Sequence, residues 1–297
     1  MNNQFILMYH SIDSPNQPAV TGSFPISMQQ FTQHIMKLRD KGYEFDFISN
    51  LHQKKDKKKK YIYITGDDGT IDWTRNVLPW CEDQKIPTHT GIITGPFEEK
   101  PLYPLAHIIQ VILKTRKKSE LENLSQRLKK SLTLAQLSYI NKIYAYEIIE
   151  YRKIIKGAFN LILEQHESYS ILGELKPNEL SLIKQRFEKL EYYKKFHFAE
   201  IGVHTKSHWA LGKDVLSYIN NEISPSYNLL LKYNLTPTKY FVSPMKPRYG
   251  ASLKDLEEEL LYLGYKGILD SNHGIWDQQD FIIPRIDAKN VEEFFQL

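Results

Sequence analysis

Strand-like and helix-like segments alternate at both ends of this 297-residue chain, and a long helical block separates the two ends. Runs rich in β-branched and aromatic residues, such as 61–65 and 199–203, alternate with helical patterns, which is typical of a parallel sheet covered by helices. From 97 to 195, apolar residues instead recur every three or four positions, as they do on helices. We therefore expect one α/β domain made of 1–96 and 196–297. The helical insertion between them is too long for a simple loop, and we expect it to act as a lid, a substrate-binding element or an oligomerisation element.

The first helix has both of its ends marked in the sequence. Ser27 followed by Gln30 is a capping box, in which each side chain accepts a hydrogen bond from a backbone N–H of the other residue. Phe31 and Ile35 follow at helical spacing, and Gly42 supplies a stop signal. These signals predict a helix directly after the first strand, as an α/β fold requires.

The composition excludes several classes of protein. With 41% hydrophobic residues the chain can bury a full core, so a disordered chain is excluded. Lys and Arg number 39 against 35 Asp and Glu, and this small excess argues against nucleic-acid binding. Only the run 54–60 is densely basic, and we expect it to be a solvated loop rather than an anion-binding site.

Three further features bear on the compartment. Cys81 is the only cysteine, which suits a reducing environment. The first residues lack the basic region and apolar run of a secretory signal, and no stretch is apolar for long enough to predict a membrane span. We therefore expect a cytoplasmic protein without a membrane span.

Two adjacent carboxylates are the strongest candidates for chemistry. Asp67 and Asp68 lie between Gly66 and Gly69, directly after the predicted strand 61–65. Ligand sites of α/β folds gather where strands end, and adjacent residues that leave a strand point in different directions. One carboxylate can then bind a metal ion while the other faces a substrate, although the same residue types also form simple acidic turns.

Two histidines follow another predicted strand. His204 and His208 come after 199–203 and lie on the same side if the backbone between them is helical. By itself the pair is equally well explained as two surface histidines. Combined with one carboxylate, it makes a three-ligand set that leaves positions open for water and substrate. A divalent metal in such a site polarises a carbonyl and lowers the pKa of water, and hydrolysis needs both effects.

These motifs resemble those of the polysaccharide deacetylases, carbohydrate esterase family four, which share the NodB-homology domain. Residues 66–69 (Gly-Asp-Asp-Gly) are similar to the family's Thr-Phe-Asp-Asp-Gly motif, and 204–208 to its His-Ser/Thr-x-x-His motif. Residues 8–12 resemble the Tyr-His-x-Ile start of the branch that includes exopolysaccharide N-deacetylases. The resemblance covers about 1–96 and 196–297, and it implies a distorted (β/α) barrel of about seven strands that carries the large all-helical insertion.

The resemblance also implies roles for individual residues. Asp68, His204 and His208 would be the ligands of a divalent metal, with zinc as the first choice. Asp67 would be the general base that activates the attacking water. His10 would line the substrate side of the site, unless it is a core histidine.

The family's third motif can be aligned in two registers. Residues 241–246 fit one form of it, and 247–250 fit an arginine-containing form. In the second register Arg248 would be a catalytic residue that pairs with Asp67, and Tyr249 would bind substrate. The sequence leaves this choice open.

Two departures from the family pattern concern the reaction itself. Gly66 stands where the family usually has Phe, which would open space beside the carboxylates or loosen their backbone. Residues 282–287 resemble the Leu-Pro-Arg-Ile strand of the Tyr-His branch, which makes Arg285 a residue that orients groups at the site. The family's histidine general acid has no clear counterpart. His273 is the nearest candidate, but it lies in a turn sequence and is better explained as a solvated loop residue.

The function that these residues support best is a metal-dependent hydrolase that removes an N-acetyl group from an acetamido sugar. The substrate would be a glycan or glycan precursor of a surface polysaccharide pathway. The alternative is a catalytically inactive glycan-binding or interaction protein derived from such an enzyme, since the usual Phe and the general acid are missing and the third motif is ambiguous. A polymerase with a Gly-Asp-Asp hairpin is disfavoured, because no separate upstream metal-binding aspartate follows a strand. An oligomer formed through the helical insertion remains open.

Overall fold

Seven parallel strands curve into a nearly closed barrel in the computed structural model, which describes residues 3–13 and 25–297. Around the barrel the order is β7, β6, β5, β1, β10, β9, β8, so β5 to β10 follow one another in chain order, and β1 pairs with β5 on one side and with the last strand, β10, on the other. The strands are Gln4–Tyr9 (β1), Lys60–Gly66 (β5), Thr88–Ile92 (β6), Ala199–Val203 (β7), Tyr240–Val242 (β8), Gly267–His273 (β9) and Ile282–Asp287 (β10). Tyr43–Phe45 (β4) pairs with β5, while Ile12–Asp13 (β2) and Ile26–Ser27 (β3) form a separate pair. The predicted distorted (β/α) barrel is confirmed.

The gap in the barrel lies between β7 and β8. No strand pairing joins these two edges within the described residues, but the Thr238 N–H donates to the Ile201 carbonyl at 2.8 Å. The two edges are therefore close enough for one backbone hydrogen bond across the gap.

Helices cover the outside of the barrel and one of its ends. Those that belong to the flanking halves are Met28–Asp40 (α1), Leu78–Gln84 (α2), Val215–Tyr218 (α9), Ser224–Lys232 (α10), Lys254–Tyr262 (α11) and Val291–Phe295 (α12). Those of the insertion are Leu105–Thr115 (α3), Lys118–Ser131 (α4), Leu134–Ile143 (α5), Glu150–Gly157 (α6), Gln165–Leu172 (α7) and Pro177–Lys184 (α8). In the described part of the chain, no helix combines the length and the apolar character needed to cross a membrane.

The start of α1 agrees with its prediction. The Ser27 side chain accepts a hydrogen bond from the Gln30 N–H, and the Gln30 side chain accepts one from the Ser27 N–H. Gly42 follows the helix with a φ of +78°, a conformation that glycine adopts without strain. The helices predicted at 71–84 and 215–233 also form, and each contains a π-helical turn, at Trp73–Val77 and Ile219–Ile223.

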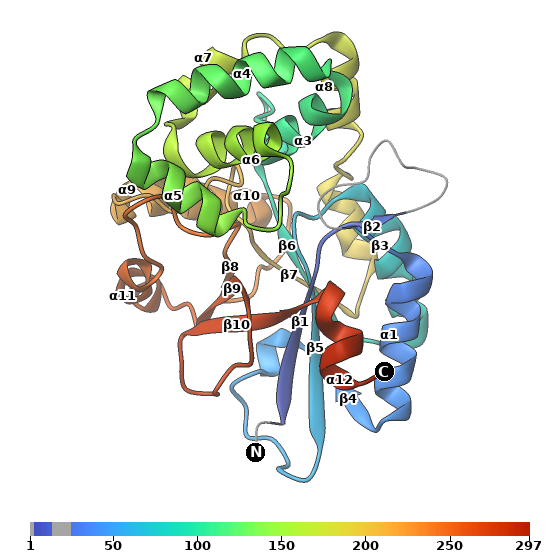
Figure 1. Cartoon of the computed structure of the whole chain (residues 1–297). Coiled ribbons are helices and arrows are strands. Elements are labelled where there is room, and N and C mark those ends of the chain that lie inside the picture. Colours follow the sequence, from blue (N-terminus) through green and yellow to red (C-terminus); the bar gives the residue numbers. More distant parts are fainter. Residues whose placement is uncertain (1–2, 14–24) are drawn as a thin grey trace.

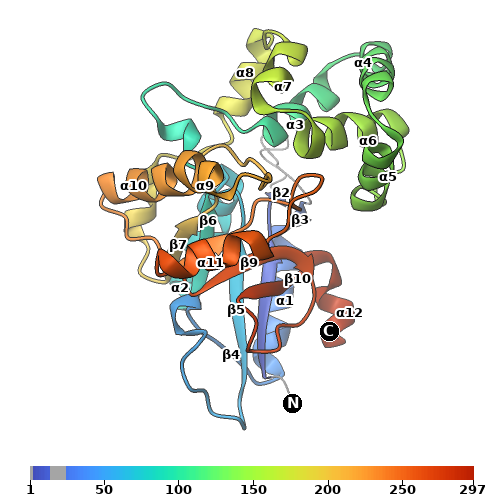
Figure 2. The same ribbon diagram turned by 90° about the vertical axis from the view of Figure 1, so that its left-hand side faces the viewer.

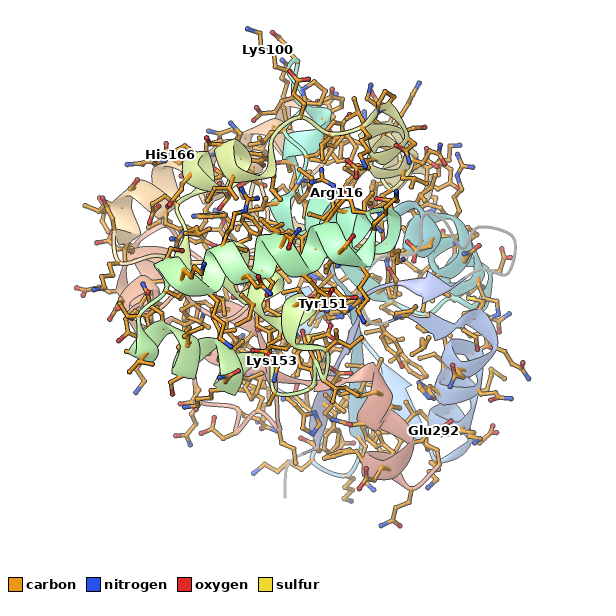
Figure 3. The ribbon with its side chains drawn as sticks, turned by 45° about the horizontal axis from the view of Figure 1, so that its top comes forward. Lys100, Arg116, Tyr151, Lys153, His166 and Glu292 are labelled. Carbon is orange, nitrogen blue, oxygen red and sulfur yellow. The ribbon has the colours of Figure 1, made fainter. Side chains whose placement is uncertain are left out.

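The insertion stands over the end of the barrel at which the parallel strands finish (Figure 1). A view turned by 90° shows its helices above the strands as well, and from above they lie in front of the barrel (Figures 2 and 3). They pack around an apolar core of their own, which includes Ile109, Ile112 and Phe159 and is separate from the barrel core. Arg116, labelled in Figure 3, donates two hydrogen bonds to Glu179 at 2.9 and 3.2 Å and thereby ties α3 to α8.

The C-terminal edge of the predicted insertion packs against the barrel. The 3-10 helix Leu190–Lys195 lies inside the predicted insertion, yet Leu190 and Tyr193 belong to the barrel core. The Tyr193 hydroxyl also donates to the Gly69 carbonyl at 3.1 Å. The boundaries of the insertion at 97 and 195 therefore stay predictions. Because Leu190 and Tyr193 pack in the barrel core, this packing favours an end of the insertion before Leu190.

The basic run 54–60 is exposed apart from Lys55. The Lys55 ammonium is half-buried and forms an ion pair with Asp46. The remaining lysines of this run have the solvent exposure expected of a loop.

Candidate metal centre and its pocket

Asp68, His204 and His208 meet at the ends of β5 and β7. Asp68 lies two residues after β5, and His204 directly follows β7. The Asp68 Oδ1 atom is 3.3 Å from His204 Nε2 and 3.2 Å from His208 Nε2. One donor atom from each residue lies within 4.8 Å of the others, and all three residues are buried at this site. The group can therefore hold a metal ion.

The hydrogen bonds of His204 show why a cation fits here. Its Nδ1 lies 2.9 Å from the Val242 carbonyl, which can only accept, so Nδ1 carries the proton and Nε2 presents a lone pair. This lone pair faces Asp68 Oδ1, and neither atom has a hydrogen-bond partner in the part of the chain that the structure describes. Two buried acceptors that face each other need a cation between them. A carboxylate with two imidazoles is a donor set that suits zinc and similar divalent ions.

The pKa shifts of the two histidines follow from the same arrangement. Burial opposes protonation of His204, but the adjacent Asp68 carboxylate raises its pKa above the usual value. Burial lowers the pKa of His208 to about 4, which keeps its imidazole neutral and available as a ligand.

The backbone that presents these ligands is in an uncommon conformation. Asp68, Thr205 and His208 have φ values of +73°, +65° and +58°, in the left-handed region that residues other than glycine rarely adopt. Such conformations persist only where surrounding contacts enforce them. The buried Glu222 carboxylate supplies one such contact, because it accepts hydrogen bonds from Ser207 N–H at 2.8 Å and from Ser207 Oγ at 2.5 Å.

Asp67 faces a different partner from Asp68. Arg285 of β10 donates two hydrogen bonds to its carboxylate, at 2.7 and 2.8 Å, and a third from Nε to the Asp270 carbonyl at 2.8 Å. Burial alone would raise the pKa of Asp67, but the Arg285 guanidinium holds it below its usual value. Asp67 is therefore ionised at neutral pH, and its two oxygens have a fixed orientation. His10 Nε2 lies 3.9 Å from Asp67 Oδ2.

The space beside Gly66 is filled rather than open. A Cβ atom at Gly66 would lie 2.3 Å from the indole of Trp73. The Trp73 Nε1–H also donates to Thr90 Oγ1 at 3.0 Å, which holds the ring in this position. The expectation that Gly66 opens space beside the carboxylates is therefore wrong, because the Trp73 ring occupies that space.

Of the two alignments of the third motif, the one over 241–246 places its residues at the site. Pro244 and Met245 line the pocket that contains Asp68, and Val242 is the residue whose carbonyl orients His204.

The expected pairing of Arg248 with Asp67 is wrong. Arg248 Nη2 donates to Glu164 Oε1 at 2.9 Å and to the Ile162 carbonyl at 2.7 Å, and its guanidinium stacks on Trp209. Together with Tyr249 it lines a separate cavity of about 600 Å³ between the barrel and the insertion. Asp67 pairs instead with Arg285, whose position on β10 points its guanidinium into the barrel end.

His273 is placed away from the pocket. It ends β9, is exposed, and accepts a hydrogen bond at Nδ1 from the Asp287 N–H at 3.3 Å. Neither of the two cavities described here has His273 in its wall. This position suits the loop residue that the sequence favours.

The pocket over the metal ligands has a volume of about 420 Å³ and is built by both parts of the molecule. The barrel contributes His10, Asp68 and His208. The insertion contributes apolar, aromatic, amide and cationic side chains, namely Ala106, Ile109, Gln110, Leu113, Lys114, Tyr144, Tyr146, Arg152, Lys156 and Asn160. The insertion thus forms most of the wall that a ligand would meet.

Sequence analysis missed one residue at the centre. His107 of α3 is buried, and its Nε2 atom lies 3.3 Å from Asp68 Oδ2. The available signal was a polar residue among Leu105, Ile108 and Ile109 on a helix that is otherwise apolar there. This signal is weak, since a histidine in such a pattern is ordinarily a core residue.

Comparison with known proteins supports the fold. No family model matches the chain, and no curated protein matches it significantly. IcaB from Ammonifex degensii superposes with a TM-score of 0.56 at 13% identity, covering 99% of this chain and 96% of that chain. The Streptococcus pyogenes deacetylase PplD, solved in complex with acetate, gives 0.52 at 17% identity, covering 97% and 96%. The de-N-acetylase from Aggregatibacter actinomycetemcomitans gives 0.52 at 14% identity, covering 96% and 95%. The chain has the fold of the polysaccharide deacetylases, as its motifs predicted.

Proposed function

We propose that this chain, which has the fold of the polysaccharide deacetylases, is itself a metal-dependent carbohydrate N-deacetylase. The observation that carries the proposal is the buried group Asp68, His204 and His208, in which lone pairs face one another beside the ionised Asp67. In solved structures of the same fold, one protein is described as a de-N-acetylase and another as a deacetylase in complex with acetate.

The reaction would be hydrolysis of the acetamido group of a sugar, which gives acetate and an amine. When bound by Asp68, His204 and His208, a divalent ion, with zinc as first choice, supplies the Lewis acidity that polarises the acetyl carbonyl and acidifies water. Asp67 takes the proton of the attacking water as general base. Arg285 keeps Asp67 ionised and oriented through its paired hydrogen bonds.

The leaving amine must regain a proton. Asp67, which takes the proton of the attacking water as general base, can then donate it to the amine, and His10 Nε2 lies 3.9 Å from Asp67 Oδ2 at the pocket. This assignment needs no separate histidine acid, which fits the exposed position of His273.

The substrate we propose is an N-acetylated sugar in a glycan or in a precursor of a surface polysaccharide. We keep the cytoplasm as the proposed compartment, because the single thiol of Cys81 suits a reducing environment. Association of chains through the insertion likewise stays a proposal.

The test is acetate release from a panel of N-acetylglucosamine oligosaccharides and lipid- or nucleotide-linked N-acetyl sugars, with the zinc-reconstituted protein. We expect turnover in the wild type, and a loss of kcat of about 10²- to 10⁴-fold in Asp67→Asn with metal still bound. Full activity in Asp67→Asn would contradict the role of Asp67 as general base. Tight binding of a sugar without acetate release from any member of the panel would favour the glycan-binding alternative.

A further inference from the structure

His107 brings the insertion into contact with the metal ligands. Its Nε2 atom lies 3.3 Å from Asp68 Oδ2, the carboxylate oxygen that does not face His204 and His208. The side chain is 1% exposed, and Nε2 forms no aligned hydrogen bond within the described chain, so its 3.3 Å approach to Asp68 Oδ2 is its contact with a charged group. Asp68 Oδ2 is therefore the one acceptor that the described structure brings near this buried nitrogen.

The neighbour of the other ring nitrogen determines the tautomer of His107. Arg186 Nη1 lies 3.2 Å from His107 Nδ1. A guanidinium has only donors, so Nδ1 must be the acceptor of this hydrogen bond. A neutral imidazole that accepts at Nδ1 carries its proton at Nε2. Nε2 then carries an N–H 3.3 Å from Asp68 Oδ2 and has no lone pair to offer a metal ion.

Arg186 forms hydrogen bonds with both α3 and the segment that follows β5. Its Nη1 also donates to Gln110 Oε1 on α3 at 2.7 Å, and the guanidinium is fully buried. Its carbonyl accepts a hydrogen bond from Ile71 N–H at 2.7 Å, three residues after Asp68. The arrangement thus links the insertion, through Arg186, to the loop that carries the metal-binding carboxylate.

We infer that His107 is a positioning residue of the metal centre, outside the coordination sphere, and that Arg186 sets its tautomer. By donating to Asp68 Oδ2, His107 leaves only Oδ1 free to face His204 and His208, so Asp68 binds the metal through one oxygen. Donors of this kind orient a ligating carboxylate and typically change metal affinity by about 10- to 100-fold. This inference rests on the proposed metal site, and it gives the insertion a part in metal binding besides its part in the pocket wall.

The test is metal affinity, measured by competition between the protein and a chromogenic chelator for zinc. We expect His107→Leu to weaken binding by about 10- to 100-fold, because Asp68 loses its orienting donor. His107→Gln, which keeps an N–H donor, should recover most of this loss. Arg186→Met should weaken binding by a smaller factor, since the freed ring can adopt either tautomer. His34→Gln is the matched control, because His34 is a buried histidine that contacts Tyr9 rather than Asp68.

The absorption spectrum of the cobalt-substituted protein separates positioning from ligation. If His107 is a positioning residue, the d–d bands of His107→Leu and His107→Gln keep the wild-type position and intensity at saturating cobalt. A changed spectrum in these variants would make His107 a fourth ligand and overturn the inference. Unchanged zinc affinity in folded His107→Leu would overturn it as well, and leave the deacetylase proposal standing. A wild-type protein that binds neither metal would overturn both.

Discussion

The barrel and the insertion contribute different things to one pocket. The barrel supplies the atoms that can hold a metal and move a proton, from Asp67, Asp68, His204 and His208 at strand ends. The insertion supplies most of the wall and a single contact, from His107, to the metal-binding carboxylate. A parallel barrel places strand-end residues reproducibly, so chemistry can be kept there while an inserted segment changes what the pocket admits. Changes in the barrel should therefore affect stability and kcat, and changes in the pocket wall that the insertion supplies should affect mainly KM.

Removal of Arg285 should have the largest effect. Arg285→Met leaves the Asp67 carboxylate buried without its partner, which we expect to lower the free energy of unfolding by about 3–5 kcal/mol. Arg285→Lys keeps the charge but loses the paired hydrogen bonds, so it should fold better and still have a reduced kcat. Denaturant unfolding together with acetate-release kinetics checks both. If Arg285→Met has the wild-type free energy of unfolding, loss of Arg285 does not leave Asp67 as an unpaired buried charge, and the prediction is contradicted.

A methyl group at Gly66 should destabilise the barrel end. In Gly66→Ala the new Cβ meets the Trp73 indole at 2.3 Å, and we expect a loss of about 1–3 kcal/mol from overpacking. Gly212→Ala is the matched control, since the nearest atom to its Cβ would be 3.9 Å away. Thermal unfolding of both variants, and of Gly66→Ala combined with Trp73→Leu, is the measurement. If Gly66→Ala costs as much stability in a Trp73→Leu background as in the wild type, the steric account is contradicted, because Trp73→Leu removes the contact while its own cavity cost is present in both members of that pair.

Arg248 should matter for the junction between the two regions and little for the reaction. Arg248→Met loses charged hydrogen bonds to Glu164 and to the Ile162 carbonyl, and we expect it to cost about 1.5–3 kcal/mol of stability. Metal content and kcat of the folded variant should stay at wild-type values. A loss of kcat comparable to that of Asp67→Asn would mean that Arg248 takes part in catalysis.

The smallest effect is expected in the wall contributed by the insertion. The Tyr144 side chain lines the pocket, and its hydroxyl accepts a hydrogen bond from Asn160 Nδ2 at 2.9 Å. Tyr144→Phe should raise KM by about 3- to 10-fold, since one hydrogen bond is worth about 1 kcal/mol. It should leave kcat unchanged, because binding is lost equally from the ground state and the transition state. A decrease in kcat without a change in KM would mean that the insertion takes part in the reaction itself.

Local patterns were sufficient to predict the alternating strands and helices of the two flanks, and the resemblance to the deacetylases supplied the barrel. The strands at 61–65 and 199–203 and the capping box at Ser27 depend on residues close in sequence, and periodicity and capping report such interactions directly. A metal site made of His204, His208 and one of the two adjacent carboxylates was also predicted at strand ends, and the resemblance assigned Asp68 as the carboxylate ligand.

Contacts between distant segments could not be predicted in this way. The third motif had two registers, and only the packing of Pro244 and Met245 at the pocket separates them. Arg248 and Arg285 are chemically identical, so the choice of partner for Asp67 depends on the path of the chain. His107 lies in an apolar helical pattern, and nothing local indicates that this helix crosses the end of the barrel.

Metal content tests the central claim most directly. Elemental mass spectrometry on the purified protein, after reconstitution and desalting, would be compared with that on the variant carrying both His204→Ala and His208→Ala. We predict about one divalent ion per chain in the wild type and almost none in the double variant, since a carboxylate alone does not retain zinc. A wild type that holds no metal after reconstitution, or a double variant that holds as much as the wild type, would contradict the account.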